Sequence, residues 1–280
     1  MTPDPHDPPD DAAGGAIDRT ISRRFWERRG ALADDPRATT LDPEPGWWVR
    51  YNVRLYQHWL LRHLALWGSS WGRVVDLGCG NGDWTLVLAR RADSVIAVDF
   101  SASLLQAAER RLGARGAAAK VSFVHSDAAS FEFPADCDLI VLGAVLQYLE
   151  DPEVEDVVRR AAAALSARGV LYVRTSTARR QAVIRNCTAD YQAIYRAPGW
   201  FEERIRSTGL TIEAVTTGTY VLADEPLHRL VGRRLWPTLG RGLAAPLRLL
   251  RRAQRMRKDT EVHHWLCRHP DPERHLPAGA

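Results

Sequence analysis

The stretch Val74–Trp84, which reads VVDLGCGNGDW, decides the fold of this chain. An apolar, β-branched run ends near an acid, three glycines spaced by one residue follow, and an amphipathic segment begins after them. Glycines let the backbone turn sharply and approach a ligand without a Cβ in the way. The stretch therefore predicts a strand, a ligand-binding loop and a helix. Its GxGxG spacing differs from the GxGxxG loop of dinucleotide-binding folds and disfavours a nicotinamide cofactor.

Short apolar runs alternate with amphipathic segments after this loop. The expected strands are Val74–Leu77, Ser94–Val98, Val121–His125, Leu139–Leu142 and Val170–Thr175, with helices expected at Asp83–Arg91, Ser101–Leu112 and Pro152–Ala167. Near-continuous apolar strands joined by helical crossovers predict a mostly parallel sheet with both faces covered. Right-handed crossovers make this a doubly wound, Rossmann-like α/β sheet, which binds ligands at the carboxyl ends of its strands.

The remaining segments are expected to decorate this core. The expected divisions are a disordered tail at 1–16, an N-terminal helical cap at 17–70, the core at 71–223 and 260–268, a basic helical insertion at 224–259 and a C-terminal tail at 269–280. The cap contains expected helices near Ile17–Arg29 and Trp47–Trp67, and a further helix begins at Pro198. Strands are expected at Leu210–Leu222 and Glu261–Arg268, the latter antiparallel, with the insertion between them.

Residues 228–258 form a strongly basic segment in an otherwise mildly acidic chain. They contain ten Arg or Lys and no Asp or Glu; because the whole chain carries +4, the remainder carries −6. Such a segment suits an anionic substrate or a nucleic-acid backbone, a membrane surface or dimer contact, or a solvated arginine-rich helix. These alternatives stay open.

Two further observations concern the setting of the protein. No apolar run reaches about 18 residues, so no membrane span is expected, and residues 1–16 lack the pattern of a secretory signal. The cysteines are far apart and show no CxxC spacing, which predicts neither a zinc site nor a disulfide framework. A reduced, cytoplasmic setting is the simplest interpretation.

Acidic residues follow successive strands, which adds chemistry to the glycine loop. Asp99 ends the second strand, seventeen residues after Gly82. An ionised Asp only accepts hydrogen bonds, so it can receive both hydroxyl hydrogens of a ribose. Phe100 offers an aromatic surface for an adenine ring, and Asp127, after the third strand, can accept a bond from its exocyclic amine.

With these residues, Val74–Thr175 resembles the core of the class I S-adenosylmethionine-dependent methyltransferases. The resemblance implies S-adenosyl-L-methionine as cofactor, with the fourth-strand segment Asp138–Leu149 beside its methionine end. The implied cofactor-binding residues are Asp76, Gly78, Cys79, Gly80, Gly82, Asp99, Phe100, Asp127, Ala128 and Gly143. Tyr51, with Arg54 as the alternative, is expected to contact the cofactor carboxylate.

Residues after the fourth and fifth strands are candidates for acceptor chemistry. Gln147 stands where many relatives have His, and an amide orients a substrate but takes no proton near neutral pH. Gln147, Tyr148 and His58 are the candidate catalytic residues, with His63 and His125 as weaker candidate bases. Tyr191, Tyr195 and Trp200 are expected to face the substrate because aromatic side chains suit flat or apolar acceptors. No acidic cluster follows the fourth strand, so no metal is expected.

The expected function is methyl transfer to a small molecule, an aromatic or amino-bearing metabolite of the biosynthetic-tailoring type. In-line displacement needs the acceptor aligned about 3 Å behind the methyl carbon, and positioning can supply several kcal/mol of the barrier. The alternatives are methylation of RNA or a peptide through the basic insertion, or a non-catalytic cofactor-binding interaction protein. The chain is expected to act as a monomer or homodimer.

Overall fold

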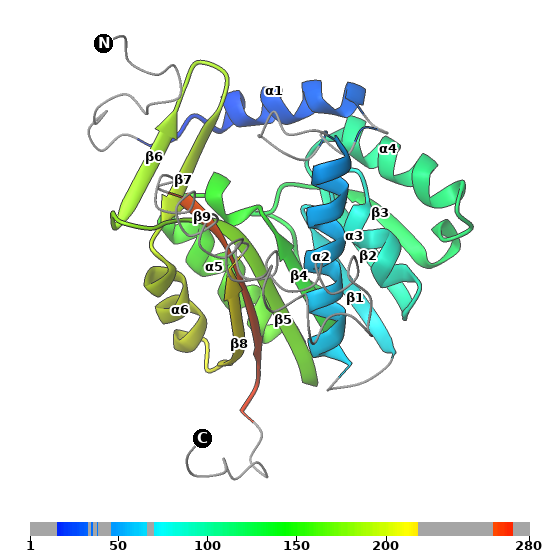
Figure 1. The fold of residues 1–280 in the computed structure, drawn as a ribbon. Coiled ribbons are helices and arrows are strands. Elements are labelled where there is room, and N and C mark those ends of the chain that lie inside the picture. The colour runs from blue at the N-terminus through cyan, green and yellow to red at the C-terminus, as the bar shows by residue number, and fades with distance from the viewer. Residues whose placement is uncertain are drawn as a thin grey trace, which may run out of the picture.

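The computed structural model describes residues 16–32, 35, 38, 46–65, 70–217 and 260–270, without the side chains of 46–52 and 55. Within these residues nine strands form one sheet, with the path β3–β2–β1–β4–β5–β7–β6 and with β9 joining β5 to β8 (Figure 1). The strands β1 to β5 are mutually parallel where they pair, and β9 runs antiparallel to both β5 and β8. The expected doubly wound sheet with an antiparallel last strand is confirmed.

The elements follow the sequence expectation closely in the core. The strands are β1 (Trp71–Leu77), β2 (Ala92–Asp99), β3 (Val121–His125), β4 (Cys137–Gly143), β5 (Leu165–Ala178), β6 (Val183–Cys187), β7 (Gln192–Arg196), β8 (Thr211–Thr217) and β9 (Thr260–Arg268). The helices are α1 (Arg19–Arg29), α2 (Gly46–Leu64), α3 (Asp83–Ala89), α4 (Ala102–Gly113), α5 (Asp151–Ala163) and α6 (Pro198–Ser207).

The structure differs from the sequence expectation in two places. The helix predicted to reach Ala167 ends at Ala163, because Leu165 already pairs with Cys137 and the carbonyl of Ala164 accepts from the Cys137 N–H at 2.9 Å. The second concerns the hairpin of β6 and β7, which was not predicted at all. It extends the sheet from the end of β5 through the pair Thr177 and Arg196, and it carries two of the candidate tyrosines.

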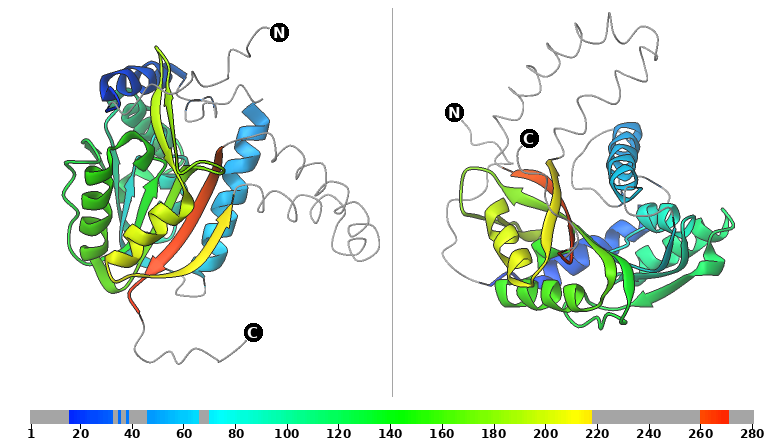
Figure 2. Two further views of the ribbon diagram at one scale, coloured as in Figure 1. Left: turned by 90° about the vertical axis from the view of Figure 1, so that its left-hand side faces the viewer. Right: turned by 90° about the horizontal axis from the view of Figure 1, so that it is seen from below.

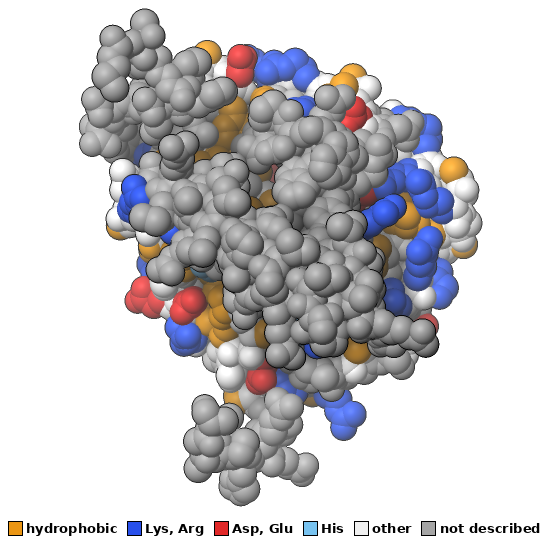
Figure 3. Space-filling model, in the orientation of Figure 1, with side chains coloured by type: hydrophobic (Ala, Val, Ile, Leu, Met, Phe, Trp, Pro, Cys, Tyr) orange, Lys and Arg blue, Asp and Glu red, His pale blue; other side chains and the backbone are white. Residues whose placement is uncertain are grey.

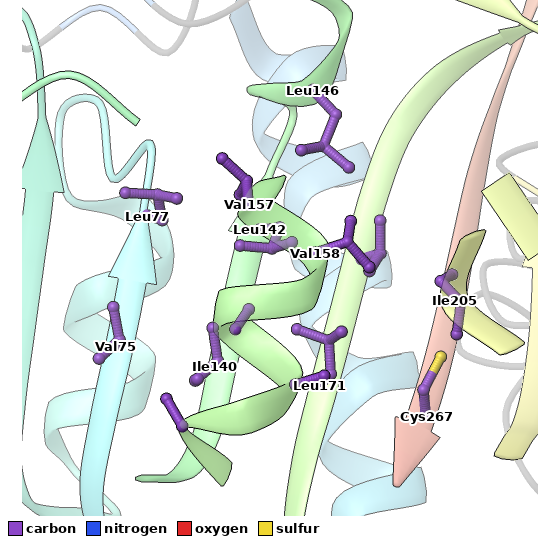
Figure 4. Close-up of a cluster of buried hydrophobic side chains, with 14 of the residues drawn as sticks. Val75, Leu77, Ile140, Leu142, Leu146, Val157, Val158, Leu171, Ile205 and Cys267 are labelled. Carbon is purple, nitrogen blue, oxygen red and sulfur yellow. The ribbon is translucent and has the colours of Figure 1, made fainter. Parts of the chain in front are cut away.

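Helices cover the sheet on both faces, and Figure 2 shows α2 on the opposite side from α5 and α6. The α5/α6 face is lined by alternate strand residues such as Val75, Leu77, Ile140, Leu142 and Leu171. Figure 4 shows these side chains gathered with those of α5. The residues between them point to the other face, which α2, α3 and α4 cover and which is called the α2–α4 face below.

Local sequence explains why α5 forms and how it packs. Glu150 and Glu153 make a reciprocal capping box, and Pro152 lies in the first turn, where its missing N–H costs nothing. Val154, Val157, Val158 and Ala161 recur at three- and four-residue steps and are buried. Burial of each valine stabilises the fold by about 1.5–3 kcal/mol.

The first helix crosses the carboxyl edge of the sheet, from the β6–β7 hairpin to α4 (Figure 1). At one end, the N–H of Ile17 donates to Glu150 Oε1 at 2.8 Å and that of Asp18 to Gln192 Oε1 at 2.6 Å. At the other end, Glu27 accepts from the Ala102 N–H at 3.0 Å and so caps the start of α4. α1 therefore spans the edge at which the sequence predicts the site.

Some expectations concern residues outside the described ones: tail residues 1–15, the basic insertion at 224–259 and residues 271–280. The domain boundaries expected from the sequence remain a proposal. Among the described residues, no helix is long and apolar enough to span a membrane.

Candidate functional site

The loop between β1 and α3 has the backbone that its glycines predict. Gly78, Gly80 and Gly82 have φ angles of 79°, 53° and 77°, in the left-handed region that favours glycine. A Cβ on Gly78 would lie 2.1 Å from Val145 Cγ1 and 3.1 Å from the Gly143 carbonyl oxygen. The end of β4 therefore lies closer to Gly78 at the end of β1 than a residue with a Cβ would permit.

Asp99 ends β2 with its carboxylate against the glycine loop. Oδ2 accepts from the Gly80 N–H at 2.8 Å and Oδ1 from the Ser101 N–H at 2.9 Å. Each carboxylate oxygen can accept a further bond, so a diol can be received without displacing the backbone donors. Burial raises the pKa of Asp99 to about 6, although the bonds from Ser101 and Gly80 oppose this.

Asn81, which was not predicted from the sequence, is a further candidate for binding a ligand. Its side chain is 1% exposed, and neither its amide oxygen nor its amide nitrogen has a hydrogen-bond partner. Leaving a buried polar group unpaired costs about 1–3 kcal/mol, which a polar ligand at the loop would offset. The only sequence signal was its place between two of the loop glycines.

Asp76 lies buried beneath the same loop. Its Oδ2 accepts from the Thr85 hydroxyl at 2.7 Å, which ties the end of β1 to α3. Burial raises its pKa to about 6, and the Thr85 hydrogen bond and the nearby Arg174 cation act in the opposite direction.

Asp127, the expected adenine-edge acid, is engaged by α1. It accepts from Arg19 Nη2 at 2.5 and 2.6 Å, from Arg23 and, at 2.8 Å, from the Ala129 N–H. Burial alone would raise the pKa of Asp127, but the bonds from Ala129 and Arg19 lower it below its usual value. An adenine amine would therefore share this carboxylate with, or compete against, two arginines.

The candidate acceptor residues meet beyond β4, under α1. The Tyr148 hydroxyl lies 3.0 Å from that of Tyr191, which lies 3.3 Å from that of Tyr195. Gln147 Nε2 donates to the Tyr148 hydroxyl at 3.3 Å, and Gln147 Oε1 accepts from Thr175 at 2.8 Å. Burial raises the pKa of Tyr148 and of Tyr191 well above their usual value. These phenols therefore stay protonated near neutral pH and serve as hydrogen-bond donors.

Several candidates lie elsewhere. Trp200 is on α6, with the guanidinium carbons of Arg196 and Arg204 at 4.7 and 4.1 Å from its ring centre. His58 is on α2, which covers the sheet face opposite Thr175 and its partner Gln147. Neither joins the tyrosines, and their assigned roles stay predictions without structural support.

The other predicted residues have ordinary surroundings. The Cys79 thiol is buried and Ala128 packs on the core beneath α5. The guanidinium of Arg23 lies 5.9 Å from the Phe100 ring centre. The rings of His63 and His125 bond the carbonyl oxygens of Trp59 and Phe100. The side chain of Tyr51 lies outside the described residues, and Arg54 is exposed.

The residues present fit an adenosine cofactor with an amino-acid end. Asp99 has spare acceptor capacity for a diol, and the unpartnered Asn81 amide lies in the loop beside it. Among the described residues no group of three or more His, Cys, Asp or Glu gathers as a metal site would require.

Comparison with known proteins identifies the same segment. Residues 74–169 match the sequence profile of a methyltransferase domain. The chain is 36% identical over 104 residues to trans-aconitate 2-methyltransferase from Rhizobium etli; the match covers 36% of this chain but only 38% of that relative.

Solved structures share the fold over most of the chain. The structure of phosphoethanolamine N-methyltransferase 1 from Haemonchus contortus, in complex with phosphoethanolamine and S-adenosylhomocysteine, matches 93% of this chain and 51% of that one, with a TM-score of 0.63 and 18% identity. The [4+2]-cyclase SpnF matches 93% of this chain and 99% of its own, with a TM-score of 0.62 and 17% identity. Residues 74–169 therefore match a methyltransferase domain, and S-adenosylmethionine-dependent methyltransferases are among the solved structures that share the fold of this chain.

Proposed function

We propose that this protein transfers a methyl group from S-adenosyl-L-methionine to a small molecule bound beside Tyr148, Tyr191 and Tyr195. The observation that carries the proposal is the glycine loop with Asp99 and the unpartnered Asn81 amide at one edge of the sheet. The cofactor supplies an activated methyl group when bound, so the protein's task is to bind, to orient and to exclude water. Two of the proteins named above, trans-aconitate 2-methyltransferase and phosphoethanolamine N-methyltransferase 1, carry small-molecule acceptors in their names, which supports this class.

The cofactor's place follows from the strand ends. Asp99 would accept the ribose hydroxyls, Asn81 would bond a polar group close to the loop, and the backbone at Gly78 and Gly143 would lie against the methionine end. Asp127 would contact the adenine edge, with Arg19 adjusting to make room. Asn81 is the residue of this set that was not predicted from the sequence.

The acceptor is proposed to lie on the tyrosine side of this edge. The phenols of Tyr148 and Tyr191 stay protonated, so they suit an oxygen or nitrogen acceptor that receives hydrogen bonds. Gln147, fixed by Thr175, orients this group but takes no proton. An acceptor that already carries a reactive lone pair near neutral pH therefore fits better than one needing a strong base.

Titration with S-adenosylhomocysteine tests the cofactor half of this proposal. Asp99→Asn should weaken binding about ten- to a hundredfold, because hydrogen bonds to a charged group are worth about 1.5–3 kcal/mol. Asp93→Asn is the matched control: it removes an acid from the same strand, but at an exposed position. Equal affinity of the two variants would contradict the role of Asp99.

Release of S-adenosylhomocysteine tests the transfer itself. A panel of phenols, amines and carboxylic acids is offered with S-adenosyl-L-methionine, and Tyr191→Phe is compared with the unchanged protein. The variant should lower kcat/KM for the active acceptor while leaving cofactor affinity within about twofold, because it removes only the neutral hydroxyl that bonds Tyr148 and Tyr195. Cofactor binding without turnover on any acceptor would favour a non-catalytic role.

The described surface gives less support to an RNA substrate. Figure 3 shows Lys and Arg side chains along the edge formed by α3 and α4. Arg90, Arg91 and Arg110 are exposed there, at the C-terminal ends of these helices. Crossover helices run opposite to parallel strands, so these cations lie away from the carboxyl edge. A methylation rate that falls steeply with salt would revive this alternative.

The cellular setting is also part of the proposal. All four cysteines are free, and Cys79, Cys137 and Cys267 are buried. This supports the reduced, cytoplasmic setting expected from the sequence.

A further inference from the structure

Arg174, near the carboxyl end of β5, belongs to none of the motifs that identify the cofactor site. It pairs with Gly143 of β4 on one side and with His264 of β9 on the other. Gly78 follows Leu77, the last residue of β1 that pairs with β4. Gly78, Gly143, Arg174 and His264 therefore form one row across the sheet, at the level of the glycine loop.

The two glycines of this row contribute no side chains of their own, although Val145 Cγ1 lies against Gly78. Arg174 Nη2 lies 3.9 Å from the position that a Cβ on Gly143 would take. The same position is 3.5 Å from the Gly78 carbonyl oxygen and 3.6 Å from that of Leu77. The guanidinium thus reaches along the row toward the junction of β1 and β4. The strand order reverses at this junction, and doubly wound sheets bind their ligands there.

The charge of Arg174 has no direct counterpart among the described residues. No carboxylate there forms an ion pair with it, and its buried Nε has no hydrogen-bond partner. The Trp84 ring centre lies 5.6 Å from its guanidinium carbon. Asp76, the acid whose pKa Arg174 affects, is bonded to Thr85 instead. A guanidinium is always charged, so its unpaired donors favour a negatively charged ligand.

His264 and Tyr172, which also neighbour Arg174, do not supply a counter-charge. His264 is fully buried; its Nδ1 is bonded to the Tyr172 hydroxyl at 2.7 Å, and its Nε2 has no partner. Both side chains are therefore neutral polar groups. Arg174 itself is only partly buried, in contrast to Arg196, which is 0% exposed and bonded to Asp151 and to two carbonyl oxygens. Arg196 is a structural cation, whereas Arg174 remains available for a ligand.

We propose that the Arg174 guanidinium binds a carboxylate or phosphate group of a ligand at the junction of β1 and β4. This rests on the proposed function, because the anion belongs either to the amino-acid end of the cofactor or to an acidic acceptor. The planar fork of arginine matches both anions with two parallel hydrogen bonds. Lysine at this position would keep the charge but lose the paired geometry.

Calorimetric titration of four proteins tests the proposal: unchanged, Arg174→Gln, Arg174→Lys and Arg168→Gln. Arg168 lies on the same strand, is exposed and is six residues away, so its replacement removes the same charge from the amino end of β5. Each protein is titrated with S-adenosylhomocysteine and with 5′-methylthioadenosine, which lacks the amino-acid end. Binding of 5′-methylthioadenosine also shows that a variant is folded at the loop.

The titrations with S-adenosylhomocysteine and 5′-methylthioadenosine test whether the anion is the cofactor carboxylate. If the anion is the cofactor carboxylate, Arg174→Gln weakens S-adenosylhomocysteine roughly ten- to a hundredfold, Arg174→Lys weakens it less, and 5′-methylthioadenosine is unaffected. Arg168→Gln behaves as the unchanged protein.

The acceptor arm uses inorganic phosphate and tricarballylate, each titrated into protein saturated with S-adenosylhomocysteine. If the anion belongs to the acceptor, Arg174→Gln leaves S-adenosylhomocysteine affinity intact but weakens or abolishes binding of at least one of these probes. Equal behaviour of Arg174→Gln and Arg168→Gln toward every probe overturns the proposal. Failure of the unchanged protein to bind S-adenosylhomocysteine would sink the proposed function instead, and the same two anions, titrated into the free protein, would still decide the role of Arg174.

Discussion

The two faces of this sheet are made by the same strands but differ in chemistry. On the α5/α6 face, Ile140 and Leu142 are fully buried in an apolar cluster. On the α2–α4 face, alternate positions carry Asp76, Asp99 and Arg174, whose polar groups meet near the glycine loop. Because successive strand residues point to opposite faces, one strand can build the core and the site at once.

The chemical difference between the two faces does not extend along the whole length of the strands. Toward the amino ends of the strands the α2–α4 face is apolar too, with Val74, Leu139 and Val170 buried there. Asp76, Asp99 and Arg174 stand near the carboxyl ends, where parallel strands feed the loops that bind ligands. The two faces therefore differ near the carboxyl ends of the strands, where the α2–α4 face carries Asp76, Asp99 and Arg174.

The largest effect should come from the apolar face. Leu142→Ala should lower the free energy of unfolding by about 3 kcal/mol, because a fully buried leucine is removed from a packed cluster. Affinity for S-adenosylhomocysteine should change little in the folded fraction. Urea unfolding measures the first quantity and calorimetry the second.

Leu32→Ala serves as the control, since Leu32 is 43% exposed. A loss below about 1 kcal/mol for Leu142→Ala would mean that the apolar face is not the main source of stability.

A smaller effect is expected from pH on the polar face. Burial raises the pKa of Asp99 to about 6, so the carboxylate that would receive the ribose hydroxyls becomes protonated below this pH. Affinity for S-adenosylhomocysteine should therefore rise with pH through 6 and be about tenfold weaker at pH 5 than at pH 7. Calorimetry at a series of pH values measures this.

Asp76 has a pKa of about 6 as well, so the two acids must be separated. Asp99→Asn should bind more weakly at neutral pH and lose most of the pH dependence, whereas Asp76→Asn should retain it. The opposite pattern would place the titrating ligand contact at Asp76.

The smallest effect should come from Tyr172 and His264, the hydrogen-bonded neutral pair beside Arg174. Tyr172→Phe removes the hydroxyl that bonds His264 Nδ1 and should lower the free energy of unfolding by about 1 kcal/mol. A thermal melt compared with that of the unchanged protein measures it. A loss as large as that of Leu142→Ala would show that this polar pair stabilises the fold as much as the apolar core does.

Local sequence was enough for the core strands and for the cofactor loop. The glycines around Gly80 and the acid at Asp99 are separated by a single crossover, and their chemistry follows from backbone freedom and strand ends. The expectation that Asp127 would face the cofactor missed Arg19, which lies 108 residues away in sequence and arrives through tertiary packing of α1. No local pattern encodes such a contact.

Arg174 and the β6–β7 hairpin were missed for related reasons. Arg174 lies in an apolar strand, and its proximity to Gly143 depends on the register of β4 against β5. The hairpin strands are only five residues long, and β7 joins the sheet through a single pair with β5. Short strands of this kind carry too little alternation to stand out from a loop.

The position of β9 between β5 and β8 has a consequence for the order of synthesis on the ribosome. β5 and β8 leave the ribosome before β9, and the edges that each of them pairs with β9 stay unpaired until residues 260–268 arrive and fit between them. His264, the last residue of the row that contains Arg174, lies on β9 and is therefore synthesised after the rest of the row. A chain whose synthesis stops after β8 would therefore have the glycine loop already made, but the edges of β5 and β8 that pair with β9 would be unpaired. Such edges pair readily with other chains, so the interval before β9 emerges is when this protein most needs a chaperone.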